Sequence, residues 1–213
     1  GRPYAANPPV FGLNKPAGME TTLQSGNYRL TEWQAALLLG GLKRLDAQVK
    51  ARDANAIYLN SLLAKIPGVM PMRRRPQVTQ QSYFNFAFRI DTEALGITNQ
   101  QFAAALNAEL NMPDEFEPPY EPLNNCGLFK PLTKKRHQLS DKYWKLLDPK
   151  RFKLPVCEDA HYRSGVVAHH QILMNSKEDM EVIAAAVEKV VKNAGELAKF
   201  KPGELKKYQP LAR

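Results

Sequence analysis

Apolar residues recur at helical spacing along the first third of the chain. From Trp33 to Ile66 they return every three or four residues, and Pro67 and Gly68 then end the pattern. This periodicity predicts one long helix over residues 32–66. Such a helix spans about 52 Å at 1.5 Å per residue, which is more than one small domain can cover. We therefore expect it to bridge domains or subunits.

A second pattern, with a period of two, runs from Tyr83 to Asp91 and predicts a strand. A further strand is predicted over residues 165–174, whereas the proline-rich segment 113–131 is predicted to be an irregular loop. The strand with the clear alternation has an aromatic core face, which consists of Phe84, Phe86, Phe88 and Ile90.

Capping residues predict three more helices. Thr98 or Asn99 precedes a helix that ends at Leu110, and Ser140 precedes a short one. Ser176 precedes the last helix, whose apolar stripe predicts a buried face. Strands that alternate with helices predict an α+β fold attached to the long helix.

The composition excludes several classes of protein. The chain has 30 Lys and Arg against 21 Asp and Glu, which gives a formal net charge of +9. The basic clusters at 73–75, 134–136 and 199–207 lack interleaved aromatic residues, so we interpret them as solvated surface and expect no nucleic-acid partner. No run of about 18 apolar residues is present, so no membrane span is expected. Cys126 and Cys157 are too few for a disulfide framework, which favours a cytoplasmic protein.

Two adjacent histidines, His169 and His170, are candidates for binding chemistry. Neighbouring residues on a strand point to opposite faces, so we do not expect both to bind one metal ion. No other metal-ligand spacing occurs, and the sequence predicts no metal site. We expect one histidine to face the core and the other a cleft or an interface, and we assign both as candidate substrate-binding residues.

The start of the long helix is the most informative stretch. Unpaired N–H groups in the first turn of a helix stabilise an anion, and Asn27 and Arg29 add donors beside that turn. Thr31 and Gln34 have the spacing of a capping box. From the residues alone, two interpretations stay open: an anion site, or residues that only cap and pack the helix.

A set of spaced positions around this stretch carries a family resemblance. It consists of Asn27–Glu32, Gln34–Ala36, Leu42, Arg44–Asp46, Arg52 and Tyr58. In order and spacing it resembles a signature of the DegT/DnrJ/EryC1/StrS family of pyridoxal-phosphate-dependent sugar aminotransferases. The details are closest to the branch that acts on aminocyclitols. The resemblance implies a homodimer that transfers an amino group from glutamate or glutamine to a keto-sugar or keto-cyclitol.

The resemblance also implies roles for individual residues. The asparagine that matches Asn27 bonds the phosphate of pyridoxal phosphate in the neighbouring subunit, and Arg29 is expected beside it as a second cofactor-binding residue. The segment Tyr120–Asn124 resembles the family's aromatic-x-Pro-Leu-His segment near the substrate pocket. Tyr120 and Asn124 are therefore candidate substrate-binding residues. Asn124 replaces the usual histidine, so we expect it to bond a hydroxyl group rather than to carry a proton.

One part of the family pattern has no match. The lysine that forms the Schiff base lies upstream in the family, and Lys15, in a loop-like context, is not expected to replace it. We therefore expect the C-terminal half of a fold-type I enzyme, without the large domain, without a catalytic residue of its own and inactive by itself. The alternative is a non-catalytic assembly or anion-binding module.

The resemblance and the patterns together predict four parts of the chain. Residues 1–30 are expected to form an irregular interface loop, and residues 31–66 a helix between domains. Residues 67–198 are expected to form a small α+β domain, and residues 199–213 an exposed basic tail.

Overall fold

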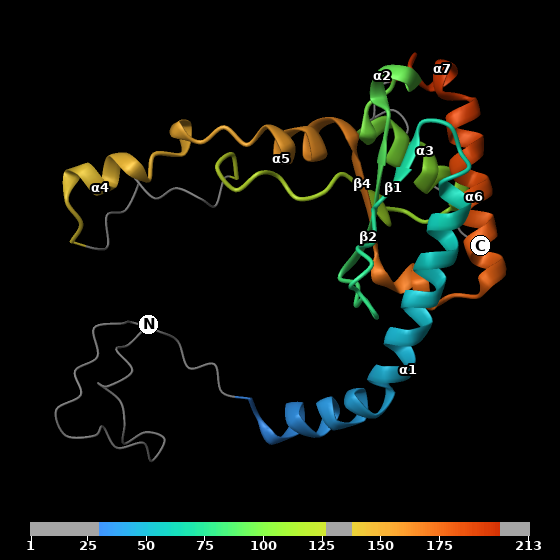
Figure 1. Ribbon diagram of the computed structural model, residues 1–213, viewed down its shortest axis with the longest axis horizontal. Helices are drawn as coiled ribbons and strands as arrows, with labels where there is room; N and C mark the ends of the chain where they lie inside the picture. Colours follow the sequence, from blue (N-terminus) through green and yellow to red (C-terminus); the bar gives the residue numbers. More distant parts are fainter. Residues whose placement is uncertain (1–29, 127–137, 201–213) are drawn as a thin grey trace. The chain divides into compact units, whose positions relative to one another are not determined.

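The computed structural model describes residues 30–126 and 138–200 (Figure 1). The chain forms two compact units, residues 1–46 and 47–213. Helix α1 (Glu32–Leu63) begins in the first unit and ends in the second, which confirms the predicted long helix. The predicted capping box is present at its start. Gln34 Oε1 accepts a 2.9 Å hydrogen bond from the Thr31 N–H, and Thr31 Oγ1 accepts one of 3.3 Å from the Gln34 N–H.

The first half of α1 exposes its apolar side chains. Trp33 is 84% exposed and Leu37 is 79% exposed. The other large apolar residues of this part that remain exposed are Leu30, Leu38, Leu39, Leu42 and Leu45. The residues that the structure describes therefore leave this side of the helix uncovered.

The second half of α1 is buried. Ala56, Leu59 and Leu63 are fully inaccessible to solvent and belong to the hydrophobic core. The α-helix ends at Leu63, three residues before the predicted end, because the last turn tightens. The N–H groups of Lys65 and Ile66 bond carbonyls three residues back, at 3.1 and 3.0 Å, as is common at helix ends.

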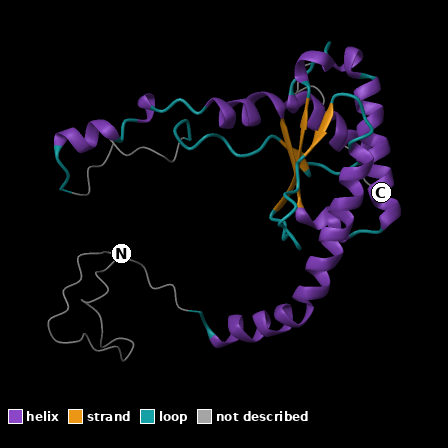
Figure 2. Cartoon of the chain, in the orientation of Figure 1, coloured by secondary structure: helices purple, strands orange, loops and turns teal. Residues whose placement is uncertain are grey.

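Four strands form one antiparallel sheet in the order β1-β2-β4-β3 (Figure 2). The strands are β1 (Val69–Pro71), β2 (Asn85–Ile90), β3 (Phe116–Glu117) and β4 (Gly165–His169). In the central pair, Phe86 lies opposite Ala168 and Phe88 lies opposite Val166. All four side chains are buried, so this face of the sheet is the core face.

Helices cover the core face. The residues of α1, α3 (Asn99–Leu110) and α6 (Lys177–Lys192) join Phe86 and Phe88 in a single hydrophobic cluster (Figure 1). The rings of Phe88 and Phe102 meet edge to face with their centroids 6.1 Å apart. The predicted caps are confirmed: Thr98 begins α3 and Ser176 begins α6, each with a capping box.

Shorter helical segments complete the fold. They are α2 (Thr92–Leu95), α4 (Asp141–Leu146), η3 (Pro149–Arg151), α5 (Pro155–Asp159), a π-helical turn η4 (Ala160–Ser164), a 3-10 segment η5 (His170–Met174) and α7 (Ala194–Leu197). Ser140 caps α4 as predicted, and Trp144 is buried. Among the described residues, no helix combines the length and the apolar character that crossing a bilayer requires.

Three sequence expectations are wrong. Phe84 is predicted to belong to the core face, yet it is 72% exposed. β2 begins at Asn85, the residue after Phe84, so strand pairing does not hold Phe84 in the core. The predicted strand 165–174 ends at His169, where the chain turns into η5. The predicted loop 113–131 contains β3, a strand too short to show a periodic pattern and formed by pairing with β4.

A buried ion pair fastens the β1–β2 connection to α1. Asp53 is only 7% exposed, and both of its carboxylate oxygens accept hydrogen bonds from the guanidinium of Arg74. The Nη2–Oδ2 distance is 3.0 Å, and Arg74 Nε also donates to the carbonyl of Val78 at 3.3 Å. The hydrogen bond from Arg74 holds the pKa of Asp53 below its ordinary value of 3.8, against the opposing effect of burial.

A glycine is required where β4 begins. A Cβ on Gly165 would lie 2.4 Å from the carbonyl oxygen of Ala160 and 2.7 Å from Cγ of Pro119. Both distances are shorter than any ordinary contact. The buried Asn99 side chain fixes the same place, because its Nδ2 donates to the carbonyls of His161 at 2.9 Å and Gly165 at 2.8 Å. The close approach therefore depends on the absence of a side chain at Gly165.

We expect Asp53→Asn to lower the free energy of unfolding by about 2 kcal/mol near neutral pH, because a charge-assisted bidentate contact is lost. A depressed folded-state pKa stabilises the fold above the ordinary value of 3.8, and this contribution disappears as the pH falls through the folded value. Urea unfolding over a pH series should show the two proteins converging in acid. Glu188→Gln, which breaks the exposed pair with Lys192, is the control and should cost at most about 0.5 kcal/mol. A constant difference at every pH would contradict the ion-pair account.

We expect Gly165→Ala to lower the free energy of unfolding by about 2–3 kcal/mol, because the new methyl group overlaps two fixed atoms. Chemical denaturation monitored by tryptophan fluorescence measures this change. Gly195→Ala in α7 is the matched control, since a Cβ there meets nothing within 4 Å. The control should be neutral or slightly stabilising. Equal stability of the two variants would show that the backbone at Gly165 can move away.

Candidate functional site

The candidate residues lie in three parts of the chain. Asn27 and Arg29, the predicted cofactor contacts, lie outside the described residues and stay predictions. Tyr120 and Asn124 lie in the connection between β3 and β4. His169 ends β4 and His170 begins η5. Within the described residues, no hydrogen bond joins the segment of Tyr120 and Asn124 to the two histidines.

Tyr120 and Asn124 have different surroundings. The Tyr120 side chain is 76% exposed. Asn124 is half-buried, and its Nδ2 donates to the carbonyl of Phe152 at 3.2 Å and to Oδ1 of Asn125 at 3.3 Å. Its Oδ1 is buried and has no hydrogen-bond partner. The Nδ2 group of Asn124 is therefore bonded within the protein, and its Oδ1 is an acceptor without a donor.

The connection that carries these residues is long and tied at its base. β3 and β4 are paired neighbours, yet residues 118–164 separate them. The Tyr162 hydroxyl donates to Glu121 Oε1 at 3.2 Å and accepts from Asn125 Nδ2 at 3.3 Å. His161 Nδ1 contacts the carbonyl oxygen of Pro119. These contacts join the outgoing and returning parts of the connection, so its direction at the sheet is fixed.

The two histidines do not straddle a strand as the sequence predicted. His169 is exposed, and its strand position directs it to the face opposite the helices. His170 lies in the 3-10 segment η5, is half-buried, and has a buried Nδ1 without a hydrogen-bond partner. The expectation that alternate sides of one strand separate them is wrong, because the strand ends between them.

Sequence reasoning missed Glu115, which lies beside both histidines. Burial raises the pKa of its carboxyl group. The charge of His169, a backbone hydrogen bond from His169 and the charge of His170 each act in the opposite direction. Glu115 Oε1 is buried and has no partner. Glu115 directly precedes β3, and the sequence pattern did not predict this strand. Without the strand, nothing in the sequence indicates that Glu115 lies near the histidines.

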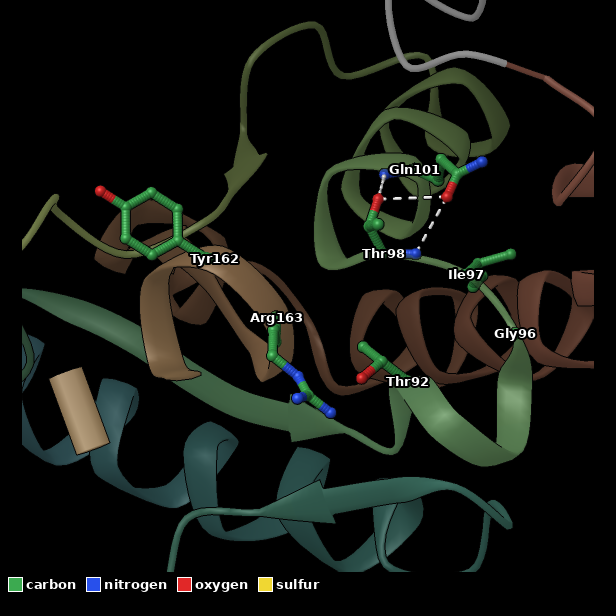
Figure 3. Close-up of a pocket in the computed structure, with 7 residues that line it drawn as sticks. All are labelled: Thr92, Gly96, Ile97, Thr98, Gln101, Tyr162 and Arg163. Atoms are coloured by element: carbon green, nitrogen blue, oxygen red, sulfur yellow. Dashed lines mark hydrogen bonds between the residues drawn. The ribbon is translucent and has the colours of Figure 1, made fainter. Parts of the chain in front are cut away.

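A pocket of about 330 Å³ lies beside the start of α3 (Figure 3). It is lined by Thr92, Gly96, Ile97, Thr98, Gln101, Tyr162 and Arg163. Its polar groups already have partners in the protein. Thr98 and Gln101 bond one another in the capping box, Gln101 Nε2 donates to the carbonyl of Phe200 at 2.7 Å, and Arg163 pairs with Glu93 at 2.8 Å. We therefore assign no ligand to this pocket.

Metal binding finds no support in the geometry. Across residues 30–126 and 138–200, no three His, Cys, Asp or Glu side chains are arranged to hold a metal ion. Cys126 and Cys157 are both free thiols.

Solved structures show the same fold. The structure of 3-amino-5-hydroxybenzoic acid synthase superimposes with a TM-score of 0.61 at 22% identity. The match covers 84% of this chain and 44% of that chain. At this identity the likeness concerns the fold, and it supports the observed α+β arrangement.

Sequence comparison gives more specific relatives. L-glutamine:2-deoxy-scyllo-inosose aminotransferase of Streptoalloteichus tenebrarius is 39% identical over 176 residues, which cover 82% of this chain and 41% of the relative. The protein of the same name from Streptomyces fradiae is 37% identical over 203 residues, which cover 93% of this chain and 46% of the relative. The chain thus spans less than half the length of these relatives.

A family model matches as well. The model of the DegT/DnrJ/EryC1/StrS aminotransferase family covers residues 10–157. This range contains the signature positions around Asn27 and the segment Tyr120–Asn124. With relatives that are more than one-third identical over most of its length, this chain belongs to the DegT/DnrJ/EryC1/StrS aminotransferase family.

Proposed function

We propose that this chain is the C-terminal part of an aminotransferase that moves an amino group from glutamine or glutamate to a keto-cyclitol. The observation that carries the proposal is the 39% identity, over 82% of the chain, to a relative named for glutamine and 2-deoxy-scyllo-inosose. A keto-sugar is the broader substrate class that the family resemblance implies. Because the chain spans less than half of that relative, the activity belongs to a polypeptide of which these residues form one part.

The proposed role of this part is that of the small domain of a fold-type I enzyme. Residues 67–198 would form that domain, and residues 31–66 the helix that leads into it. The α+β fold of the second unit and its likeness to 3-amino-5-hydroxybenzoic acid synthase support this assignment. The lysine that binds the cofactor is expected outside these residues, so the chain by itself should be inactive.

The proposed cofactor is pyridoxal phosphate. It supplies the electron-withdrawing ring that amino-group transfer requires. Asn27 would donate its amide N–H to the cofactor phosphate, and Arg29 would add a charged donor. Both residues shortly precede α1 in the sequence, and the N–H groups of the first turn of a helix favour an anion.

The proposed substrate contacts are Tyr120 and Asn124. The exposed ring of Tyr120 can cover one face of a small cyclic molecule. The Oδ1 of Asn124 has no hydrogen-bond partner but is buried, so it accepts a bond from a substrate hydroxyl group only where the substrate displaces the atoms that cover it. The tied base of the β3–β4 connection would hold both residues in a fixed direction before the substrate binds.

The proposed assembly is a homodimer in which Asn27 acts in the partner's site. The exposed apolar side chains at the start of α1 support it, because Trp33, Leu37 and Leu42 are all more than half exposed in this chain. Large exposed apolar side chains that gather in one segment are typical of an interface with another domain or subunit.

A chimaera tests the activity. We expect a protein in which this chain replaces the matched 203 residues of the Streptomyces fradiae relative to bind pyridoxal phosphate and to aminate 2-deoxy-scyllo-inosose with glutamine. The expected rate is within about a hundredfold of that of the relative, since most residue differences lie away from reacting atoms. Product formation by mass spectrometry is the measurement.

Two controls accompany this experiment. The isolated chain should show no turnover and no covalently bound cofactor. A second chimaera, with the cofactor-binding lysine of the relative replaced by alanine, should bind substrate without turnover. A folded chimaera that holds the cofactor and aminates no keto-cyclitol would refute the proposed function.

Mixed dimers test the role of Asn27. An Asn27→Ala chimaera and a chimaera without the cofactor-binding lysine should each be inactive or nearly so. If Asn27 acts across the interface, the mixed dimer carries both defects in one site and leaves the other site intact. We then expect up to about half of the activity per dimer to return. Demonstrated subunit exchange without recovery would put Asn27 in the site of its own subunit.

A further inference from the structure

Three polar residues lie in one row across the sheet. The register of β2 and β4 puts Asn85 directly opposite His169. On the other side of β4, Phe116 lies opposite Ala168 and Glu117 lies opposite Val167. Extending this antiparallel register by one residue brings Glu115 beside His169. The row therefore contains an amide, an imidazole and a carboxylate from three neighbouring segments.

The row belongs to the face of the sheet that the helices leave open. Side chains alternate along β2 and β4, and Phe86 and Ala168 point into the core. Asn85 and His169, one residue away in each strand, consequently point to the opposite face. His169 is exposed, and Asn85 and Glu115 are half-buried, so part of each side chain lies at the surface of this face.

Part of the hydrogen-bonding capacity of the row is unused. Within the described part of the chain, neither the Asn85 amide nor the His169 ring makes a side-chain hydrogen bond. Glu115 Oε1 is buried and without a partner. The Asn85 amide and the His169 ring are therefore free to exchange hydrogen bonds with a ligand at the surface.

We propose that Asn85, His169 and Glu115 form a binding row for the hydroxyl groups of the ketone substrate. This inference rests on the proposed function and adds a specific surface to it. Residues directly opposite in an antiparallel pair have Cβ atoms about 5 Å apart, so one six-membered ring can contact Asn85 and His169 together. An amide, an imidazole and a carboxylate supply both donors and acceptors, as adjacent hydroxyl groups require.

The charge of the row selects the neutral substrate over the anionic one. Glu115 and Glu117 both belong to this face, and their carboxylates repel a phosphate or the carboxylate of an amino acid. A polyhydroxylated ketone carries no charge and meets no such repulsion. The row therefore takes the ketone, and the amino donor and the cofactor phosphate bind elsewhere.

A titration of the isolated chain tests the row without any turnover. The probe is myo-inositol, which has the hydroxyl groups but no ketone. We expect saturable NMR shifts at the Asn85 side-chain amide and the His169 ring, with a dissociation constant in the millimolar range. Inorganic phosphate and glutamate should produce no saturable shift at these groups.

Variants give the test its specificity. Asn85→Ala and His169→Ala should each weaken inositol binding about fivefold to tenfold, the effect of losing one hydrogen bond. Asn175→Ala is the matched control, because Asn175 is an exposed asparagine on another segment whose backbone carbonyl, not its side chain, is used. In the active chimaera, Asn85→Ala should raise KM for the ketone by a similar factor and leave KM for glutamine unchanged.

The outcomes separate this inference from the proposed function. The row is refuted if the shifts do not saturate, if they survive both substitutions, or if phosphate and glutamate bind equally well. Inositol binding at the row together with an inactive, cofactor-loaded chimaera would refute the aminotransferase and leave the row standing. If the chimaera is active and neither substitution changes its KM for the ketone, the binding row is refuted and the proposed aminotransferase function stands.

Discussion

The antiparallel pairing of β2 with β4 is the contact on which the rest of the structure depends. Five residue pairs, from Asn85 with His169 to Arg89 with Gly165, fix one register. Because side chains alternate along both strands, that register decides at once which residues enter the core and which face outward. A slip by one residue would carry Phe86 and Phe88 to the open face and bury Asn85 and Arg89.

Hydrophobic burial selects this register over its neighbours. Phe86, Phe88 and Phe102 are each almost fully inaccessible, and burying a phenylalanine contributes about 1.5–3 kcal/mol. The second half of α1 depends on the same cluster through Leu59 and Leu63. Because the apolar residues of β2 and β4 point into the core, the polar residues that alternate with them, such as Asn85 and His169, point to the open face. Its amide and imidazole side chains are consequently available to a ligand.

The β3–β4 connection is held in a different way. It leaves and rejoins the sheet through polar contacts, such as those of Tyr162 with Glu121 and of Asn99 with the carbonyls of His161 and Gly165. Such contacts fix direction at modest net gain in stability, since each exchanges bonds to water for bonds within the protein. The contacts of such a segment can change without disturbing the core.

The sequence by itself determined the elements whose signals are local. The capping box at Thr31, the N-caps at Thr98 and Ser176 and the alternation along β2 depend on neighbouring residues, so the sequence pattern predicted them. The family membership could also be predicted from the sequence, because the signature positions from Asn27 to Tyr58 lie in one short stretch of the chain. Only the tertiary structure decided the rest. β3 exists through its pairing with β4, β4 ends where η5 begins, and Glu115 meets His169 across two strands. The pairing of β3 with β4 and the approach of Glu115 to His169 join residues about fifty positions apart, and no local pattern of hydrophobic and polar residues encodes such a contact.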